Sequence, residues 1–176
     1  SMRDTYMLAL KYLGYSLNSN DEGEMREAQE LLIKQKPDVQ AYLVDEARDE
    51  VVAGNAAMAV VYSGEAYLGN QYNENLAYVI PKEGSNVWLD GWVITKSCDN
   101  IEAAQQFLDF LCREDIAMKN FEYIYYSTPN EAVINALSEE DRQNEALVPS
   151  EHATDNCEVS LQLSTEANDL MNELWK

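Results

Sequence analysis

The chain has 176 residues and a mass of 20.0 kDa, which suffices for one sizeable domain or for parts of two lobes. Hydrophobic residues make up 46% of it and charged residues 25%, as in an ordinary globular protein. The charge balance is unusual, because 12 basic residues face 32 acidic ones and the formal net charge is −20. Such a surface repels nucleic acids and anionic membranes and attracts cations. We therefore exclude DNA and RNA as partners.

The cysteines and the single histidine give no metal-binding pattern. Cys98, Cys112 and Cys157 form no Cys-x-x-Cys pair, and His152 is the only histidine, so we expect no metal site and no cofactor. Cys112 lies in an apolar helical pattern, which favours a buried thiol. No apolar run reaches the ~18 residues of a membrane span, and no signal peptide opens the chain. The abrupt start at Ser1 is typical of an expressed fragment.

Amphipathic helices alternate with short apolar strands along the chain. The periodicity predicts helices over residues 4–13, 22–36, 45–53, 100–112, 114–123, 131–137 and 165–175, with a further short one after the turn at 63–65. It predicts strands over 39–44, 57–62, 76–80 and 88–95. The run at 57–62 is continuously apolar, which fits a strand buried on both faces of a parallel sheet. The pattern predicts an α/β fold with substantial parallel pairing.

An indole and a carboxylate stand two residues apart in the segment 81–94. In an extended strand, Trp88 and Asp90 point to the same face, so a flat π surface would lie beside a negative charge. That pair suits an aliphatic cation, because the carboxylate binds an ammonium group and the ring attracts its charge. The alternative is a strand with Trp88 in the core and Asp90 at a solvated end.

Four stretches, in the same order along the chain, resemble a known family. They are Arg3-Asp4 with the helix end Lys11-Tyr-Leu-Gly-Tyr-Ser16, Ala59-Val-Val-Tyr-Ser-Gly-Glu65, Pro81-Lys-Glu-Gly84 followed by Trp88-Leu-Asp90, and Tyr125-Tyr-Ser-Thr-Pro-Asn130. Together they are similar to the polyamine-binding (spermidine/putrescine-binding) proteins of bacterial ABC importers. The resemblance implies a type II periplasmic-binding-protein fold, in which two α/β lobes, each a mostly parallel mixed sheet flanked by helices, close around the ligand.

The resemblance also implies how the chain is divided. Residues 1–86 would form the α/β core of the second lobe, residues 87–137 would cross toward the first lobe, and residues 138–176 would return to the second. The first half of the first lobe would then be absent. We expect the fragment to rearrange or to associate with another copy of itself, because sheet edges and apolar surface would otherwise stay uncovered.

Five residues match ligand-contacting positions of this family. The acids Asp4 and Asp90 would bind amines, and Trp88 and Tyr62 would pack on the methylenes. Tyr126 would pack against the ligand or form a hydrogen bond near it, and the neighbouring Tyr125 could take the same register. Read without the resemblance, Asp4 is an ordinary acid in the first turn of a helix and Tyr62 the end of a core strand.

Three other positions depart from the family's pattern. A second acid would fall on Ser1, an amide contact falls at Cys157 or Glu158, and Val44 stands where a small polar residue is common. These departures leave the choice between a two-amine and a three-amine ligand open.

The resemblance implies a solute-binding protein outside the cytoplasm that captures spermidine or putrescine and delivers it to the permease subunits of an ABC transporter. The alternative is a periplasmic-binding protein for another solute such as a sugar, since sugars also stack on aromatic rings. An interaction domain without a ligand is a third reading. We do not expect an enzyme, because the chain has no Gly-x-Ser-x-Gly elbow, P-loop or dinucleotide fingerprint.

Overall fold

The computed structural model describes residues 1–150 and 152–176, and the chain divides into two compact units. Unit 1 comprises Ser1–Ala59, Val79–Trp88 and Glu151–Lys176, and unit 2 comprises Val60–Tyr78 and Leu89–Ser150. Each unit joins segments that are far apart in the sequence, and each has a hydrophobic cluster of its own.

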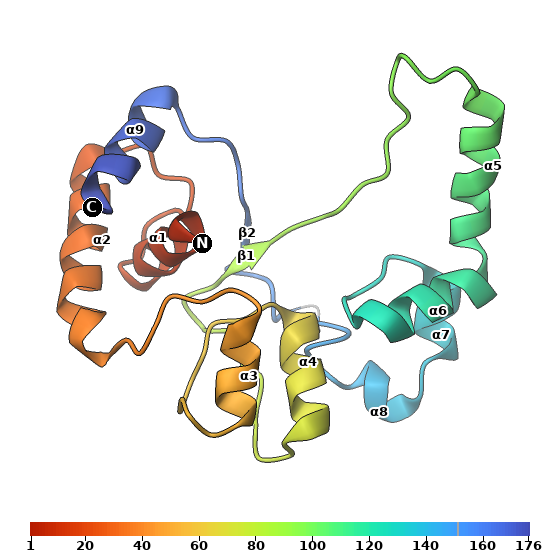
Figure 1. Ribbon diagram of the computed structural model, residues 1–176, viewed down its shortest axis with the longest axis horizontal. Coiled ribbons are helices and arrows are strands. Elements are labelled where there is room, and N and C mark those ends of the chain that lie inside the picture. The colour runs from red at the N-terminus through yellow and green to blue at the C-terminus, as the bar shows by residue number, and fades with distance from the viewer. Residues whose placement is uncertain (151) are drawn as a thin grey trace. The chain divides into compact units, whose positions relative to one another are not determined.

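Three helices lie side by side in unit 1 (Figure 1), namely α1 (Met2–Tyr12), α2 (Glu22–Gln35) and α9 (Thr165–Leu174). Capping side chains set where two of them begin. Asp21 accepts a hydrogen bond from the Glu24 N–H at 3.0 Å, and Ser164 accepts one from the Ala167 N–H at 3.1 Å. The shorter helices of this unit are η1 (Lys36–Asp38) and α3 (Glu46–Val52).

The core of unit 1 lies where the apolar stripes of these three helices meet. Its buried members are Tyr6, Ala9, Leu10, Met25, Ala28, Leu32, Leu163, Ala167 and Met171. Leu10 and Met25 are completely buried, and burying a side chain of that size contributes about 1.5–3 kcal/mol. The Trp175 ring lies 6.1 Å from the Tyr6 ring, so the last helix packs onto the first.

A two-stranded parallel sheet ties the C-terminal segment to the middle of unit 1. Strand β1 (Asn86–Val87) pairs with β2 (Glu158–Val159), and Asn86 lies opposite Glu158. Gly84 has a φ of +95°, and a Cβ there would overlap the carbonyl of Asn156. Glycine is required at this position because it tolerates both the left-handed backbone and the close approach.

Unit 2 contains α4 (Ser63–Tyr72), α5 (Ile101–Cys112), α6 (Glu114–Ile124), α7 (Glu131–Ala136) and α8 (Glu139–Arg142). Its buried cluster consists of Phe121, Val133, Leu137 and Leu147. Asn130 caps α7 by accepting a hydrogen bond from the Ala132 N–H at 3.1 Å, and its amide donates to the Cys112 carbonyl at 2.9 Å. One side chain therefore links the end of α5 to the start of α7.

The prediction of strands at 39–44, 57–62, 76–80 and 88–95 was wrong, because these segments do not pair into a sheet among the described residues. In the part of the chain that the structure describes, only β1 and β2 are paired, and β1 ends just before Trp88. The segment 57–62 is not buried on both faces either, since Met58 is 88% exposed and Val60 70%. An apolar run becomes a strand only when a partner strand satisfies its backbone groups, and these runs have none.

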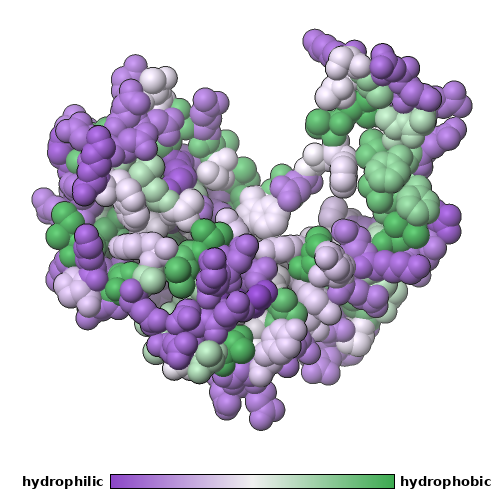
Figure 2. All heavy atoms as spheres, in the orientation of Figure 1, coloured by the Kyte–Doolittle hydropathy of each residue, from purple (hydrophilic) through white to green (hydrophobic). Residues whose placement is uncertain are grey.

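Helix α5 confirms the predicted helix but keeps an uncovered apolar side. None of its residues is buried, and Figure 2 shows hydrophobic surface along it. We call Trp92, Phe107 and Phe110 the α5 apolar face, because the Phe107 ring lies 6.5 Å from Trp92 and 6.4 Å from Phe110. The prediction of a buried Cys112 was wrong, since its side chain is exposed on this uncovered helix.

Candidate ligand-binding site

Two predicted ligand-contacting residues, Tyr62 and Tyr126, lie together in unit 2. Their ring centroids are 6.5 Å apart and their planes meet at 66°, an edge-to-face arrangement. Tyr62 stands at the N-cap of α4 and is 41% exposed, and Tyr126 is half-buried. The pair therefore combines a fixed mutual orientation with surface that a ligand can reach.

The start of α4 comes unusually close to the chain that carries Tyr126. A Cβ at Gly64 would lie 2.9 Å from the Ile124 carbonyl oxygen and 3.1 Å from that of Tyr125. Glycine is needed here for close approach, because any side chain would push the two segments apart. The Tyr62-Ser-Gly64 sequence thus explains how a helix start and a distant loop bring the two tyrosine rings together.

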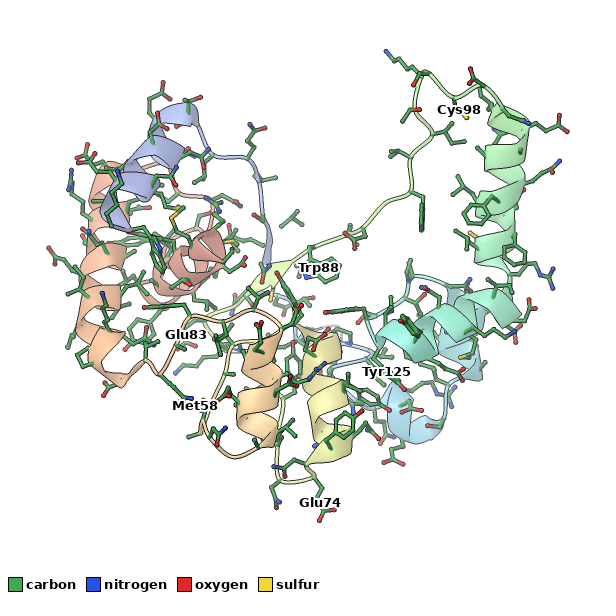
Figure 3. The ribbon with its side chains drawn as sticks, viewed as in Figure 1. Met58, Glu74, Glu83, Trp88, Cys98 and Tyr125 are labelled. Carbon is green, nitrogen blue, oxygen red and sulfur yellow. The ribbon has the colours of Figure 1, made fainter. Side chains whose placement is uncertain are left out.

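Tyr125 connects α6 to this pair through an uncommon backbone conformation. It is the one non-glycine residue with positive φ (+56°) in the described part of the chain, and its N–H donates to the Phe121 carbonyl at 2.8 Å. Its ring lies 5.1 Å from the Tyr67 ring of α4. In Figure 3 the labelled Tyr125 lies near the end of α6. The Tyr67 hydroxyl donates to Asp141 of α8 at 3.3 Å, and burial, followed by the Asp141 charge, raises the pKa of Tyr67.

Trp88 and Asp90 lie in an extended segment beyond β1. Trp88 is the last residue of unit 1 and 40% exposed, so it belongs to neither hydrophobic cluster (Figure 3). Asp90 belongs to unit 2 and is exposed, and among the described residues its carboxylate has no ion pair or hydrogen bond. Their placement on one face stays a prediction.

Asp4 lies in the first turn of α1, in unit 1. Its half-buried carboxylate accepts a hydrogen bond from the Ser1 hydroxyl at 2.6 Å and lies 3.4 Å from the Ser1 amino group. These contacts fit an acid at a helix N-terminus. Asp4 and Trp88 therefore belong to one unit, and Tyr62, Asp90 and Tyr126 to the other.

Glu158, one of the two positions to which a family contact was matched, is occupied by bonds within unit 1. Its carboxylate pairs with Lys11 Nζ at 2.9 Å and accepts hydrogen bonds from the Ser16 hydroxyl and the Leu17 N–H. Partial burial works to raise the pKa of Glu158, but these hydrogen bonds and the Lys11 charge outweigh it and lower the pKa. Glu158 anchors β2 to the end of α1.

A separate pocket of about 260 Å³ lies within unit 2. It is lined by Ala66, Tyr67, Asn70, Tyr78, Asn144, Glu145 and Ala146, and it contains none of the five predicted site residues. The described residues hold no group of three histidine, cysteine or acidic side chains that could bind a metal ion.

The sequence belongs to the bacterial extracellular solute-binding proteins, whose family profile matches residues 1–149. Members of this family are solute-binding components of transporters rather than enzymes. The fold is the α/β architecture of type II periplasmic-binding proteins, here rich in helix and with a small parallel sheet.

Individual relatives agree with this assignment. The spermidine/putrescine-binding periplasmic protein of Salmonella typhimurium is 35% identical over 84% of the chain, and the putrescine/agmatine-binding protein of Pseudomonas aeruginosa is 29% identical over the same share. The crystal structure of the spermidine/putrescine ABC transporter substrate-binding protein PotD from Streptococcus pneumoniae matches 99% of the chain with a TM-score of 0.88 and 35% identity.

The chain spans about half the length of these relatives. It covers 42% of each of the two curated proteins and 54% of the S. pneumoniae structure. Separately, a search of the described residues finds no helix with both the length and the hydropathy that crossing a membrane requires.

Proposed function

We propose that this chain is part of an extracytoplasmic solute-binding protein that captures spermidine or putrescine for an ABC importer. The observation that carries the proposal is the edge-to-face pair of Tyr62 and Tyr126. The same unit contains Asp90, whose carboxylate is exposed and has no ion pair or hydrogen bond among the described residues. The names of the similar proteins from S. typhimurium and P. aeruginosa support the same ligand class. They give no support to a sugar as the alternative ligand.

The chemistry of the five residues suits an alkyl polyamine. Alkyl amines, like the lysine side chain, remain protonated at neutral pH, so Asp4 and Asp90 would bind the ammonium ends. A hydrogen bond to a charged group contributes about 1.5–3 kcal/mol, and a cation–π contact about 0.5–2 kcal/mol. A micromolar complex has a binding free energy of ~8 kcal/mol. Two carboxylates and two or three rings would approach that value only when water is excluded from the site.

Ligand capture in this proposal requires both lobes. On the division that the resemblance implies, residues 1–86 and 138–176 belong to the second lobe and residues 87–137 to the first, with the remainder of the first lobe outside this chain. The two compact units divide the chain differently, because unit 2 joins residues 60–78 to residues 89–150, so this lobe division stays a prediction. The loaded protein would then dock on the permease subunits at the outer face of the membrane. The 176-residue chain alone would bind polyamines weakly.

Self-association of the 176-residue chain is also part of the proposal. The α5 apolar face exposes Trp92 by 75% and Phe107 by 53%, and Leu89 and Val93 nearby in sequence are more than 80% exposed. Exposed apolar surface of this kind favours association. A second copy would cover it when the rest of the first lobe is missing.

A ligand panel tests the proposed function. The thermal midpoint of the encoded full-length protein is measured with spermidine, putrescine, a monoamine of similar length, and neutral sugars. A ligand that binds only the folded protein raises its stability by about 2.7 kcal/mol at a hundredfold excess over Kd. We expect the two polyamines to raise the midpoint and the sugars to leave it unchanged. A midpoint that responds to a sugar and not to polyamines would replace this function with the alternative.

A further inference from the structure

The Tyr67 ring of α4 contacts Tyr125, the residue that precedes Tyr126 in the chain. We propose that Tyr67 is a positioning residue for polyamine binding, which holds Tyr125 in place and thereby fixes the Tyr126 ring against Tyr62. This inference rests on the proposed function of the chain. All of the residues involved belong to unit 2.

Helix α4 supplies three parts of the arrangement. Tyr62 stands at its N-cap position, and Gly64 and Tyr67 follow at a three-residue spacing that puts them on one side of the helix. Both contact the end of α6: Gly64 lies against the carbonyls of Ile124 and Tyr125, and the Tyr67 ring is 5.1 Å from the Tyr125 ring. The helix that carries one binding ring therefore also holds the chain that carries the other.

The left-handed backbone of Tyr125 makes this support necessary. A bulky residue with positive φ is strained and persists only where its surroundings hold it. Tyr125 turns the chain at the end of α6, so its conformation sets the direction in which Tyr126 leaves the helix. The Tyr67 ring contacts Tyr125 in this conformation, and both rings pack against the buried cluster of unit 2.

The phenol of Tyr67 is in turn held at its far end. Its hydroxyl donates to Asp141 Oδ1 at 3.3 Å, and the other oxygen of Asp141 accepts a hydrogen bond from the Ser138 hydroxyl at 2.7 Å. Ser138 caps α8, so the acceptor belongs to an ordered helix start. Tyr67 thus spans the distance from α8 to Tyr125, and its orientation is fixed at both ends.

Removal of the Tyr67 hydroxyl tests the proposal. The Tyr67→Phe variant keeps the ring and loses one hydrogen bond, so we expect spermidine to bind the full-length protein roughly 2- to 10-fold more weakly by calorimetry. Tyr72→Phe is the matched control, because Tyr72 is 72% exposed on the same helix, and it should leave Kd unchanged. If Tyr67→Phe does not fold, Gly64→Ala is measured instead, because the added Cβ of residue 64 would displace the segment that carries Tyr125.

A double-mutant cycle distinguishes positioning from a general loss of stability. If Tyr67 acts through Tyr126, Tyr67→Phe should have no further effect on Kd in a Tyr126→Ala background. An equal effect in both backgrounds, or an unchanged Kd in the single variant, would overturn the proposal.

A readout without ligand separates this inference from the proposed function. Hydrogen exchange of the peptide spanning residues 121–128 should be faster in Tyr67→Phe than in the wild type, and unchanged exchange would contradict the inference. A wild-type protein that binds no polyamine would refute the proposed function instead.

Discussion

At the scale of single residues, the same side-chain type serves different purposes according to its neighbours. Glu158 is locked to Lys11 and Ser16, whereas Asp90 is exposed and unpaired among the described residues. A carboxylate that is already satisfied gains little from a ligand amine, because its hydrogen bonds would have to be exchanged. This difference is why we assign Asp90 to the ligand and Glu158 to the fold.

Replacement of Glu158 should destabilise unit 1. Glu158→Gln removes the partner of Lys11, whose side chain is only 14% exposed, and we expect a loss of about 1.5–3 kcal/mol in the free energy of unfolding at pH 7. Urea unfolding measures this loss. Glu30→Gln, an exposed acid of the same unit, is the control and should change little.

The effect of Glu158→Gln should also depend on pH. The pKa of Glu158 is lower in the folded state than its ordinary value of 4.5, so its stabilisation is complete above that value. It is lost as the pH falls through the lower pKa of the folded state. The wild type and the variant should therefore converge in strongly acidic solution, and a difference that is constant from pH 7 to pH 2 would contradict this account.

At the scale of elements, short capping interactions determine how the helices of unit 2 are joined. Asn130→Ala should lower the free energy of unfolding by about 0.5–2 kcal/mol, because the variant loses the cap of α7 and the bond to the Cys112 carbonyl. Asn120→Ala on the exposed side of α6 is the control and should be neutral or slightly stabilising. Equal effects of the two variants in chemical denaturation would mean that Asn130 does not join the helices.

The helices could be predicted from the sequence far better than the strands. The 3.6-residue apolar period is a local signal, and the structure confirms the helices that it predicts. A strand depends on a partner elsewhere in the chain, and among the described residues the apolar run at 57–62 has no such partner. Local pattern alone therefore overestimated the sheet.

The sequence likewise predicted some residues of the candidate site and missed others. Tyr62 and Tyr126 came from a resemblance between motifs, and the ring contact between them agrees with a shared role. The sequence predicted no role for Gly64, Tyr67 or Tyr125, although Gly64 and Tyr125 lie in the matched motifs. A close approach between residues sixty positions apart leaves no periodic signal in the sequence. The glycine two residues after Tyr62 was the only local hint of that approach.

At the scale of the whole molecule, the chain exposes apolar surface that a monomer rarely keeps. We expect the average molar mass of the 176-residue chain, measured by light scattering, to rise with protein concentration. Phe107→Ser on the α5 apolar face should reduce that rise. Tyr123→Ser is a control, since Tyr123 is 85% exposed but lies outside that face. A monomeric mass at every concentration would contradict the proposed self-association.

We propose that Asp90, on the segment after β1, binds one ammonium group of a polyamine. Calorimetry of spermidine with the full-length protein, as wild type, Asp90→Asn and the control Asp109→Asn, tests it most directly, because Asp109 is an exposed acid of the same unit. We predict that Asp90→Asn weakens Kd by roughly 10-fold or more, the equivalent of one charged hydrogen bond, while Asp109→Asn leaves it unchanged. An affinity for spermidine that is the same in all three proteins would contradict the account.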